Sequence, residues 1–233
     1  MQRLTLSLVV AIGNAILSMP TASATTLFVN GDFTVGNTGF TSGYSFVVDA
    51  ASNCVPEGVY TIGTSPQSCH PAWPSSYGAP PGASANTMIV NGATVAGVPV
   101  WSETVTVVPN TTYYFSVWVA SNYANPAVLS FSINGAKIGG NVTASSTLGL
   151  WKQFYAPWNS GASTTAVSSL LNQNIVANGN DFSLDLFAFD TVVPVGGTST
   201  VPEPASLTLL GVGATGLAFL RRPRQRRTSR PGI

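Results

Sequence analysis

Short stretches in which apolar and polar residues alternate fill the middle of the chain, and turn-forming residues separate them. In one stretch, Tyr113, Phe115 and Val117 fall on a single face. A spacing of two is the period of a β-strand with one buried face. The pattern predicts ten strands: Thr26–Val29, Tyr44–Val48, Val59–Ile62, Thr87–Val90, Val100–Val107, Thr112–Ala120, Val128–Ile133, Leu150–Tyr155, Ala166–Leu171 and Phe182–Phe189.

These strands, with almost no helical periodicity between them, predict an all-β fold in which two sheets pack face to face over residues 25–190. Asn134-Gly135 predicts a tight hairpin, because a type I′ turn needs positive φ at both central residues. Asn91-Gly92 is a similar signal. In the last strand, Leu184 and Leu186 are expected on one face, opposite Asp185.

The first 24 residues have the layout of a secretory signal peptide. A basic Arg3 precedes an apolar stretch over residues 4–17, and Ala22-Ser23-Ala24 follows as a small-residue cleavage site. The sequence therefore predicts export and a mature chain that begins at Thr25. A retained N-terminal anchor is the alternative.

The last thirty-odd residues have three parts in a fixed order. Val201, Pro202, Glu203 and Pro204 come first, and an uncharged apolar run over residues 205–220 follows. At 16 residues, this run is shorter than the roughly 17–25 that comfortably cross a bilayer. A basic cluster then acts as a stop-transfer signal on the cytoplasmic side, ahead of a cytoplasmic tail over 228–233: Arg221, Arg222, Arg224, Arg226 and Arg227.

This ordered trio resembles the PEP-CTERM sorting signal of Gram-negative bacteria, with the motif, helix and arginine cluster spanning 201–227. The resemblance implies recognition by an exosortase, a membrane protease-transpeptidase that cuts near the motif. It also implies an inner-membrane intermediate held by the short transmembrane helix, followed by delivery to the cell surface or the exopolysaccharide matrix. Residues 191–200 are expected to be a flexible linker that gives the protease access. The alternative is a C-terminal anchor that is never processed.

Removing both end segments changes the charge of the part that folds. Residues 25–200 hold two lysines against seven acidic residues, a net charge of −5, although the whole chain carries +1. Seven of the nine basic residues belong to the two ends. The body has no basic stripe, which excludes nucleic acid as its partner.

Cys54 and Cys69 are the only cysteines, and in an exported chain they are expected to form one disulfide. The bridge would close a loop of fourteen intervening residues. His70 follows directly, but two cysteines and one histidine are one ligand short of a structural zinc site. The disulfide is therefore preferred to a metal.

The body also resembles jelly-roll modules of the carbohydrate-binding kind. The resemblance is carried by Val29-Asn30-Gly31-Asp32-Phe33, by Trp101 and Trp151, and by Asp181-Phe182-Ser183-Leu184-Asp185. It implies that the first and last strands lie side by side, where Asp32 and Asp190 are candidate ligands of a structural calcium ion. Thr34 replaces the acidic residue that usually follows the Asp-Phe pair. The alternative is a turn aspartate that caps its own backbone.

Residues 54–85 form a proline-rich segment that is too long for a simple connection, and loops of this length are commonly functional. Trp73, Tyr77 and Trp158 are candidates for a glycan-stacking surface, because aromatic faces pair with the apolar face of a sugar ring. Core or loop packing is the alternative for the same side chains.

Catalytic motifs are sparse in this sequence. A single histidine and seven scattered body carboxylates offer few ways to build a nucleophile with its base. Asp49 and Glu57 are candidate hydrolase carboxylates, whereas Asp181 and Asp185 are expected roughly 13 Å apart on one strand, too far for that role.

Three hypotheses for function follow. The leading one is a non-catalytic surface or matrix protein associated with exopolysaccharide. The others are a glycan-binding module that uses loop aromatics and a secreted polysaccharide hydrolase.

Overall fold

The computed structural model describes residues 26–201, which contain eleven strands and one short helix. The elements are β1 (Ser45–Phe46), β2 (Val59–Gly63), α1 (Pro66–Cys69), β3 (Thr87–Asn91), β4 (Val98–Thr106), β5 (Thr112–Ser121), β6 (Val128–Ile133), β7 (Ala136–Thr143), β8 (Lys152–Asn159), β9 (Thr165–Asn172), β10 (Asp181–Asp190) and β11 (Thr198–Ser199).

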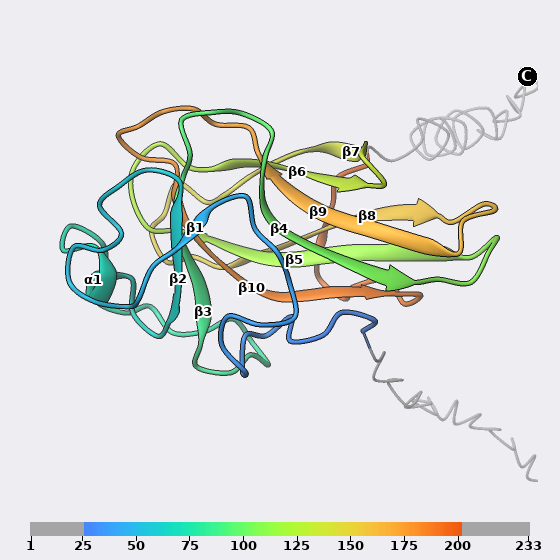
Figure 1. The fold of residues 1–233 in the computed structure, drawn as a ribbon, viewed down its shortest axis with the longest axis horizontal. Helices are drawn as coiled ribbons and strands as arrows, with labels where there is room; N and C mark the ends of the chain where they lie inside the picture. Colours follow the sequence, from blue (N-terminus) through green and yellow to red (C-terminus); the bar gives the residue numbers. More distant parts are fainter. Residues whose placement is uncertain (1–25, 202–233) are drawn as a thin grey trace, which may run out of the picture.

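Two sheets face each other and form a β-sandwich (Figure 1). The larger sheet has the order β1-β2-β3-β10-β5-β8-β11, and the smaller has β4-β9-β6-β7. Aromatic side chains fill the space between them. Trp101 of β4 stacks on Phe187 of β10, with ring centroids 4.1 Å apart, and both are buried. The all-β sandwich predicted from the sequence is confirmed.

The alternating pattern placed the central strands correctly. Tyr113, Phe115, Val117 and Val119 of β5 are all buried in the main core, as expected for one face of a strand. Nine of the ten expected ranges contain a strand. The exception is 26–29, which has no strand of its own, although the Leu27 N–H donates to the Phe189 carbonyl (2.9 Å) and so lies beside β10.

The two Asn-Gly signals have different outcomes. Asn134 and Gly135 have φ of 52° and 78° and join β6 to β7 as a hairpin, which confirms that turn. The hairpin's second strand, β7, was not among the expected strands because Gly139 and Gly140 interrupt its pattern. Asn91-Gly92 does not form a hairpin: Asn91 ends β3, and the chain then crosses to β4 in the other sheet.

A bulge in β10 overturns the expected face of Leu186. The register of β10 against β5 shifts between Asp185 and Ala188, and Leu186 takes a left-handed φ of 47°. An extra residue in one strand reverses the inward and outward positions beyond it. Leu184 therefore shares the core with Phe187 and Phe189, while Leu186 is only half-buried.

The outer face of the larger sheet is not open. Residues 47–58 and 64–86, here called the covering loops, fold over the ends of β2, β3 and β10, where α1 lies (Figure 1). They enclose a second, smaller hydrophobic cluster, made of Cys54, Val59, Cys69, Trp73 and Ile89. The sandwich is therefore covered by loops on one outer side as well as packed between its sheets.

The expected flexible linker needs correction at its C-terminal end. Thr198–Ser199 pairs with β8 as the parallel strand β11, and the Thr200 N–H donates to the Tyr155 carbonyl (2.9 Å). The Thr200 carbonyl accepts a hydrogen bond from Gly140 of β7 (2.9 Å), so the segment touches both sheets. A short edge strand of this kind can form because Gly139 and Gly140 have no side chain to obstruct Thr200.

The expected signal peptide, with Ala22 and Ala24, and the expected sorting helix with its arginine cluster lie outside the described residues. Within residues 26–201, no helix is long and apolar enough to cross a membrane.

Candidate functional site

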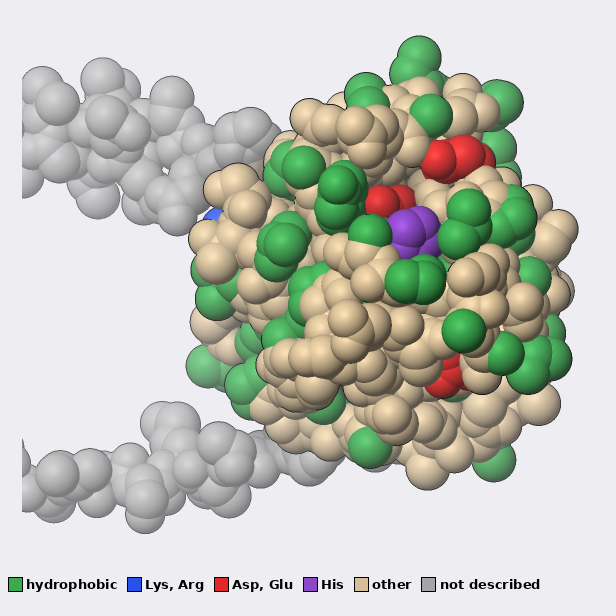
Figure 2. Space-filling view, turned by 90° about the vertical axis from the view of Figure 1, so that its left-hand side faces the viewer, with side chains coloured by type: hydrophobic (Ala, Val, Ile, Leu, Met, Phe, Trp, Pro, Cys, Tyr) green, Lys and Arg blue, Asp and Glu red, His purple; other side chains and the backbone are tan. Residues whose placement is uncertain are grey.

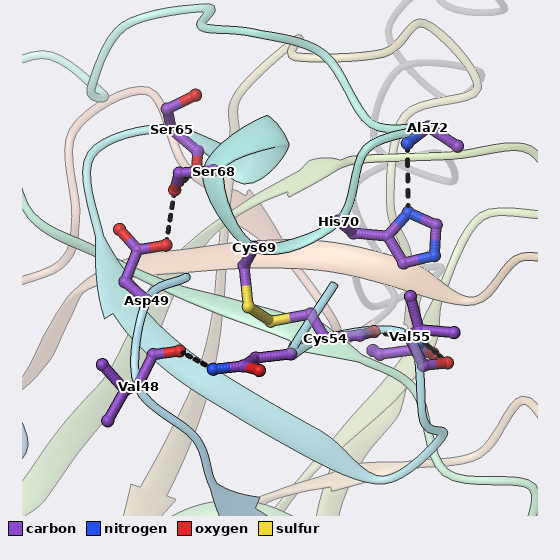
Figure 3. Close-up of a disulfide and its surroundings, with 11 residues drawn as sticks. Val48, Asp49, Cys54, Val55, Ser65, Ser68, Cys69, His70 and Ala72 are labelled. Carbon is purple, nitrogen blue, oxygen red and sulfur yellow. Dashed lines mark hydrogen bonds between the residues drawn. A yellow bond between two sulfur atoms is a disulfide. The ribbon is translucent and has the colours of Figure 1, made fainter. Parts of the chain in front are cut away.

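A disulfide between Cys54 and Cys69 closes the covering loops on themselves (Figure 3). Both cysteines are fully buried, and the Cys54 N–H donates to the Cys69 carbonyl (3.1 Å). Asp49 accepts a hydrogen bond from the Ser68 hydroxyl on α1, which ties the first loop to the helix (Figure 3). This bridge holds His70 and the residues after it against the sheet.

Trp73 lies beneath the surface, in contact with the sheet. It is 2 % exposed, and His70 stacks on it with ring centroids 4.5 Å apart and planes 16° apart. Its Nε1–H donates to Oδ2 of Asp181, the first residue of β10 (3.2 Å). Trp73 has no free face for a sugar ring, so its expected role in a stacking surface is wrong in this conformation, and loop packing describes it instead.

A cavity of about 130 Å³ opens beside Trp73. We call it the acceptor pocket; its lining comes from the covering loops, from Tyr123 and the segment 177–179, and from the adjacent ends of β3 and β10. The side chains that matter for its chemistry are Glu57, His70, Trp73, Asn91 and Asp181. Asn91 and Asp181 are register partners on neighbouring strands, and this pairing brings them together.

Hydrogen-bond acceptors dominate the acceptor pocket. Oδ1 of Asn91 and Oδ1 of Asp181 are buried and have no hydrogen-bond partner among the described residues. The amide nitrogen of Asn91 determines the orientation of the side chain, since Nδ2 donates to the Cys54 carbonyl (2.8 Å) and the Val55 carbonyl (3.2 Å). Asn91 Oδ1 and Asp181 Oδ1 are therefore fixed in position, and neither oxygen accepts a hydrogen bond from the described residues.

The pocket's titratable groups are shifted by burial. The pKa of Asp181 is raised to about 7. Desolvation is the main cause and the nearby charge of Glu57 adds to it, whereas hydrogen bonds from Trp73 and from the Gly92 backbone to this carboxyl group act in the opposite direction. Burial also raises the pKa of Glu57 and lowers the pKa of His70, which favours the neutral imidazole. Figure 2 shows the purple patch of the chain's single histidine next to red acidic and green hydrophobic patches on this face.

Tyr77 and Trp158 lie in different places. The Tyr77 hydroxyl contacts Ser183 Oγ (2.7 Å) on β10, and burial raises its pKa. Trp158 of β8 packs near Phe189, with ring centroids 6.1 Å apart. Phe189 lies toward the opposite end of β10 from Ser183. The three expected aromatics therefore do not form one platform, because strand register separates them.

Sequence reasoning missed Trp151 as a partner of Tyr77. The two rings meet edge to face at 5.8 Å, and Trp151 Nε1–H donates to the Gly78 carbonyl (2.9 Å). Tyr77 also lines a groove of about 330 Å³ with Thr64, Ser65 and Thr87. The only sequence signal was the position of Trp151 just before β8, which does not reveal this contact.

The candidate calcium ligands do lie near each other. Asp32 and Asp190 line one cavity of about 340 Å³, here called the N-terminal hollow. Each carboxylate, however, accepts hydrogen bonds from its own turn: Asp32 from Thr34 N–H and Oγ1–H, and Asp190 from Val192 N–H. Among residues 26–201, no group of three or more His, Cys, Asp or Glu side chains gathers as a metal site.

The N-terminal hollow therefore matches the turn-capping alternative for both aspartates. The residues present do not fit a complete calcium site, and calcium binding there stays an untested prediction.

The candidate hydrolase carboxylates are dispersed among different partners. Asp49 bonds Ser68, and Glu57 lies on the surface beside the acceptor pocket. Asp181 bonds Trp73, whereas Asp185 accepts the Leu186 N–H (2.7 Å) and its burial raises its pKa to about 8. Each carboxylate thus has a local environment of its own.

The C-terminal part of the chain matches a family model. Residues 200–225 match the PEP-CTERM protein-sorting motif, beginning one residue after β11. The chain carries a PEP-CTERM sorting motif. This sorting motif indicates an exported protein that is handled by an exosortase at the membrane.

Comparisons of the whole chain are less specific. No curated protein matches it. Among solved structures, TmCBM61 in complex with beta-1,4-galactotriose is similar at 12 % identity over 72 % of this chain and 100 % of its own, with a TM-score of 0.45. The Family 16 Carbohydrate Binding Module-2 has 17 % identity over 70 % of this chain and 98 % of its own, with a TM-score of 0.41.

A tailspike protein 4 enzymatically active domain from bacteriophage CBA120 is also similar. It has 10 % identity over 72 % of this chain and 21 % of its own, with a TM-score of 0.43. Carbohydrate-binding modules are thus among the structural neighbours, as the resemblance implied. At these TM-scores the likeness assigns neither ligand nor activity to this chain.

Proposed function

We propose that this chain is a non-catalytic surface or extracellular-matrix protein whose β-sandwich is exported and then separated from its C-terminal segment by an exosortase. The observation that carries the proposal is the position of the sorting motif. Its match begins at residue 200, immediately after the last strand, Thr198–Ser199. A cut near Pro204 would therefore leave every element of the sandwich intact.

The two end segments support the same route. Residues 1–24 would direct export and be removed after Ala24, and residues 205–220 would hold the chain in the inner membrane as a transient intermediate. The arginines from Arg221 onward would stop transfer and remain in the cytoplasm. The destination is the cell surface or matrix of a Gram-negative bacterium.

The body's surface chemistry supports contact with hydrated polysaccharide. Residues 25–200 contain only nine lysine, aspartate and glutamate side chains, two lysines and seven acids. Serine, threonine, asparagine and glycine supply much of the remaining polar surface, so the body can meet exopolysaccharide through hydrogen bonds.

Mass spectrometry of the protein recovered outside the cells tests the proposal. The C-terminus is expected close to Pro204, and the N-terminus at Thr25. Glu203→Ala is expected to accumulate the unprocessed chain in the inner membrane, whereas the conservative control Thr200→Ser is expected to be processed normally. Recovery of an external species that retains Leu220 would overturn the proposed processing.

Glycan binding is the second candidate, and a specific observation favours it. That observation is the pair of unpartnered acceptors in the acceptor pocket rather than an aromatic platform. Glycan-array binding by the exported protein tests it. Because Trp73 is buried, Trp73→Ala would act by disturbing the pocket wall and not by removing a stacking face.

A further inference from the structure

Two buried acceptors point to a ligand in the acceptor pocket. Asn91 is 3 % exposed and Asp181 is 5 % exposed, and Oδ1 of each has no donor among the described residues. Leaving a buried polar atom unpaired costs about 1–3 kcal/mol. These two atoms differ from the other unpaired buried atoms of the described residues in that both belong to side chains that line this one cavity. A molecule that brings donors would satisfy both.

The charges in the pocket specify which donors fit. The buried Asp181 and the exposed Glu57 both line the pocket, and their charges act on each other. Among the described residues that line the pocket there is no lysine or arginine. His70 offsets the carboxylates little, since burial lowers its pKa and so favours its neutral form. The pocket therefore favours a cation over a neutral or anionic ligand.

The size and walls of the pocket favour an organic cation. Its volume of about 130 Å³ is close to that of a cavity of about 150 Å³ that accepts a six-membered ring. Val55 and Ala72 supply apolar walls beside the acceptors, whereas Trp73 lines the pocket but is only 2 % exposed and offers no free ring face. A bare metal ion is less suited, because no metal-binding group of three His, Cys, Asp or Glu side chains occurs within residues 26–201.

We propose that the acceptor pocket binds one amino-sugar unit, with its primary ammonium group between the Asp181 and Glu57 carboxylates and a hydroxyl donating to Asn91 Oδ1. The ring lies against the apolar walls, and the rest of a glycan would extend outward past Glu57. The proposal goes beyond the surface role above and does not depend on it, since binding is measured on the purified chain whatever its destination.

Titration of the purified full-length chain with glucosamine and with glucose at neutral pH tests this inference. The two sugars differ only in an ammonium group against a hydroxyl, so they isolate the role of charge. The readout is the NMR signal of the Trp73 indole N–H, which donates to Asp181. We expect glucosamine to shift this signal with saturation, and glucose to bind about tenfold more weakly or not at all.

Three variants make the test specific. Asp181→Asn and Glu57→Gln are each expected to weaken glucosamine binding about tenfold, because each removes one charge and keeps the shape. Glu57 is exposed, so its variant is expected to fold normally even if Asp181→Asn does not. Asp32→Asn removes the same charge from the N-terminal hollow and is expected to bind like the unaltered chain.

Two outcomes would overturn the proposal. In the first, glucose shifts the Trp73 signal as strongly as glucosamine, so charge does not select the ligand. In the second, neither sugar shifts it, which would mean that only water meets the two acceptors. Normal processing at the sorting motif would leave the proposed surface role standing in either case.

Discussion

The acceptor pocket and the N-terminal hollow are both lined by two acidic side chains, yet they differ in how those side chains are satisfied. In the hollow, Asp32 and Asp190 accept hydrogen bonds from the turns that carry them. In the pocket, Asp181 and Asn91 each keep one buried acceptor without a donor among the described residues. The comparison teaches that unpaired acceptors, rather than acidity, distinguish a candidate ligand site from a self-capped turn.

The largest expected effect is a dependence of stability on pH. Burial raises the pKa of Asp181 to about 7 and that of Asp185 to about 8, from an ordinary value of 3.8. A carboxyl group with a raised pKa binds its proton more tightly in the folded chain, so stability is greatest at low pH and is lost as pH rises. We expect the free energy of unfolding to fall by several kcal/mol between about pH 4 and pH 8.

Urea unfolding across this pH range measures the effect. Asp181→Asn is expected to flatten part of the fall, and Asp185→Asn another part. His70 works in the opposite direction at the acid end, because its lowered pKa makes protonation unfavourable in the folded chain. A flat profile, or stability that rises toward pH 8, would show that burial does not govern these carboxyls.

The next effect concerns the disulfide, which the pocket has and the hollow lacks. Replacing Cys54 and Cys69 together by serine is expected to lower the free energy of unfolding by about 3 kcal/mol, because the bridge joins two residues 15 positions apart and so restricts the unfolded chain. It should also release Trp73 and abolish the response to glucosamine. Chemical unfolding followed by tryptophan fluorescence measures the loss of stability, and the Trp73 indole N–H signal measures the loss of the glucosamine response.

Reductant provides the control for this prediction. It should destabilise the unaltered chain by a similar amount and leave the double serine variant unchanged. Equal stability of the two forms would mean that packing around Trp73, rather than the bridge, holds the covering loops.

The smallest expected effect lies in the N-terminal hollow. Asp32→Ala removes the acceptor for Thr34 N–H and Oγ1–H, at a cost of about 0.5–1.5 kcal/mol per lost hydrogen bond at most, and less where water replaces it. Thermal unfolding, with Thr38→Ala as a nearby control, checks the direction. Strong stabilisation of the unaltered chain by added calcium, lost in Asp32→Ala and Asp190→Asn, would show that the hollow is more than a pair of capped turns.

The sequence predicted the sandwich well where local chemistry decides the conformation. Period-two alternation identified β5, and Asn134-Gly135 identified a hairpin because few residues adopt positive φ. The pattern failed at Asp185–Ala188, since a bulge depends on the pairing of β10 with β5 and leaves no local signature at Leu186. Gly139 and Gly140 concealed β7 for a similar reason: the strand is held by its neighbours and not by its own residues.

The candidate site was less accessible to sequence reasoning. Trp73 was identified as notable, but whether an aromatic side chain is exposed or buried depends on the long-range contact with Asp181. Glu57, His70 and Asp181 were each considered separately, because only strand register and the folded loops bring them around one cavity. Unpaired acceptors such as Asn91 Oδ1 have no sequence signal at all.

The docking of Thr198–Ser199 on β8 determines how a tethered molecule would be presented. The chain leaves the sandwich beside Tyr155 and β7, away from α1 and the covering loops (Figure 1). A body attached through the residues that follow would be held by the edge of its larger sheet, with the disulfide-closed tip directed away from the point of attachment. Its orientation, and with it which neighbours can reach that tip, would be set by three hydrogen-bonded residues at the rim of a sheet.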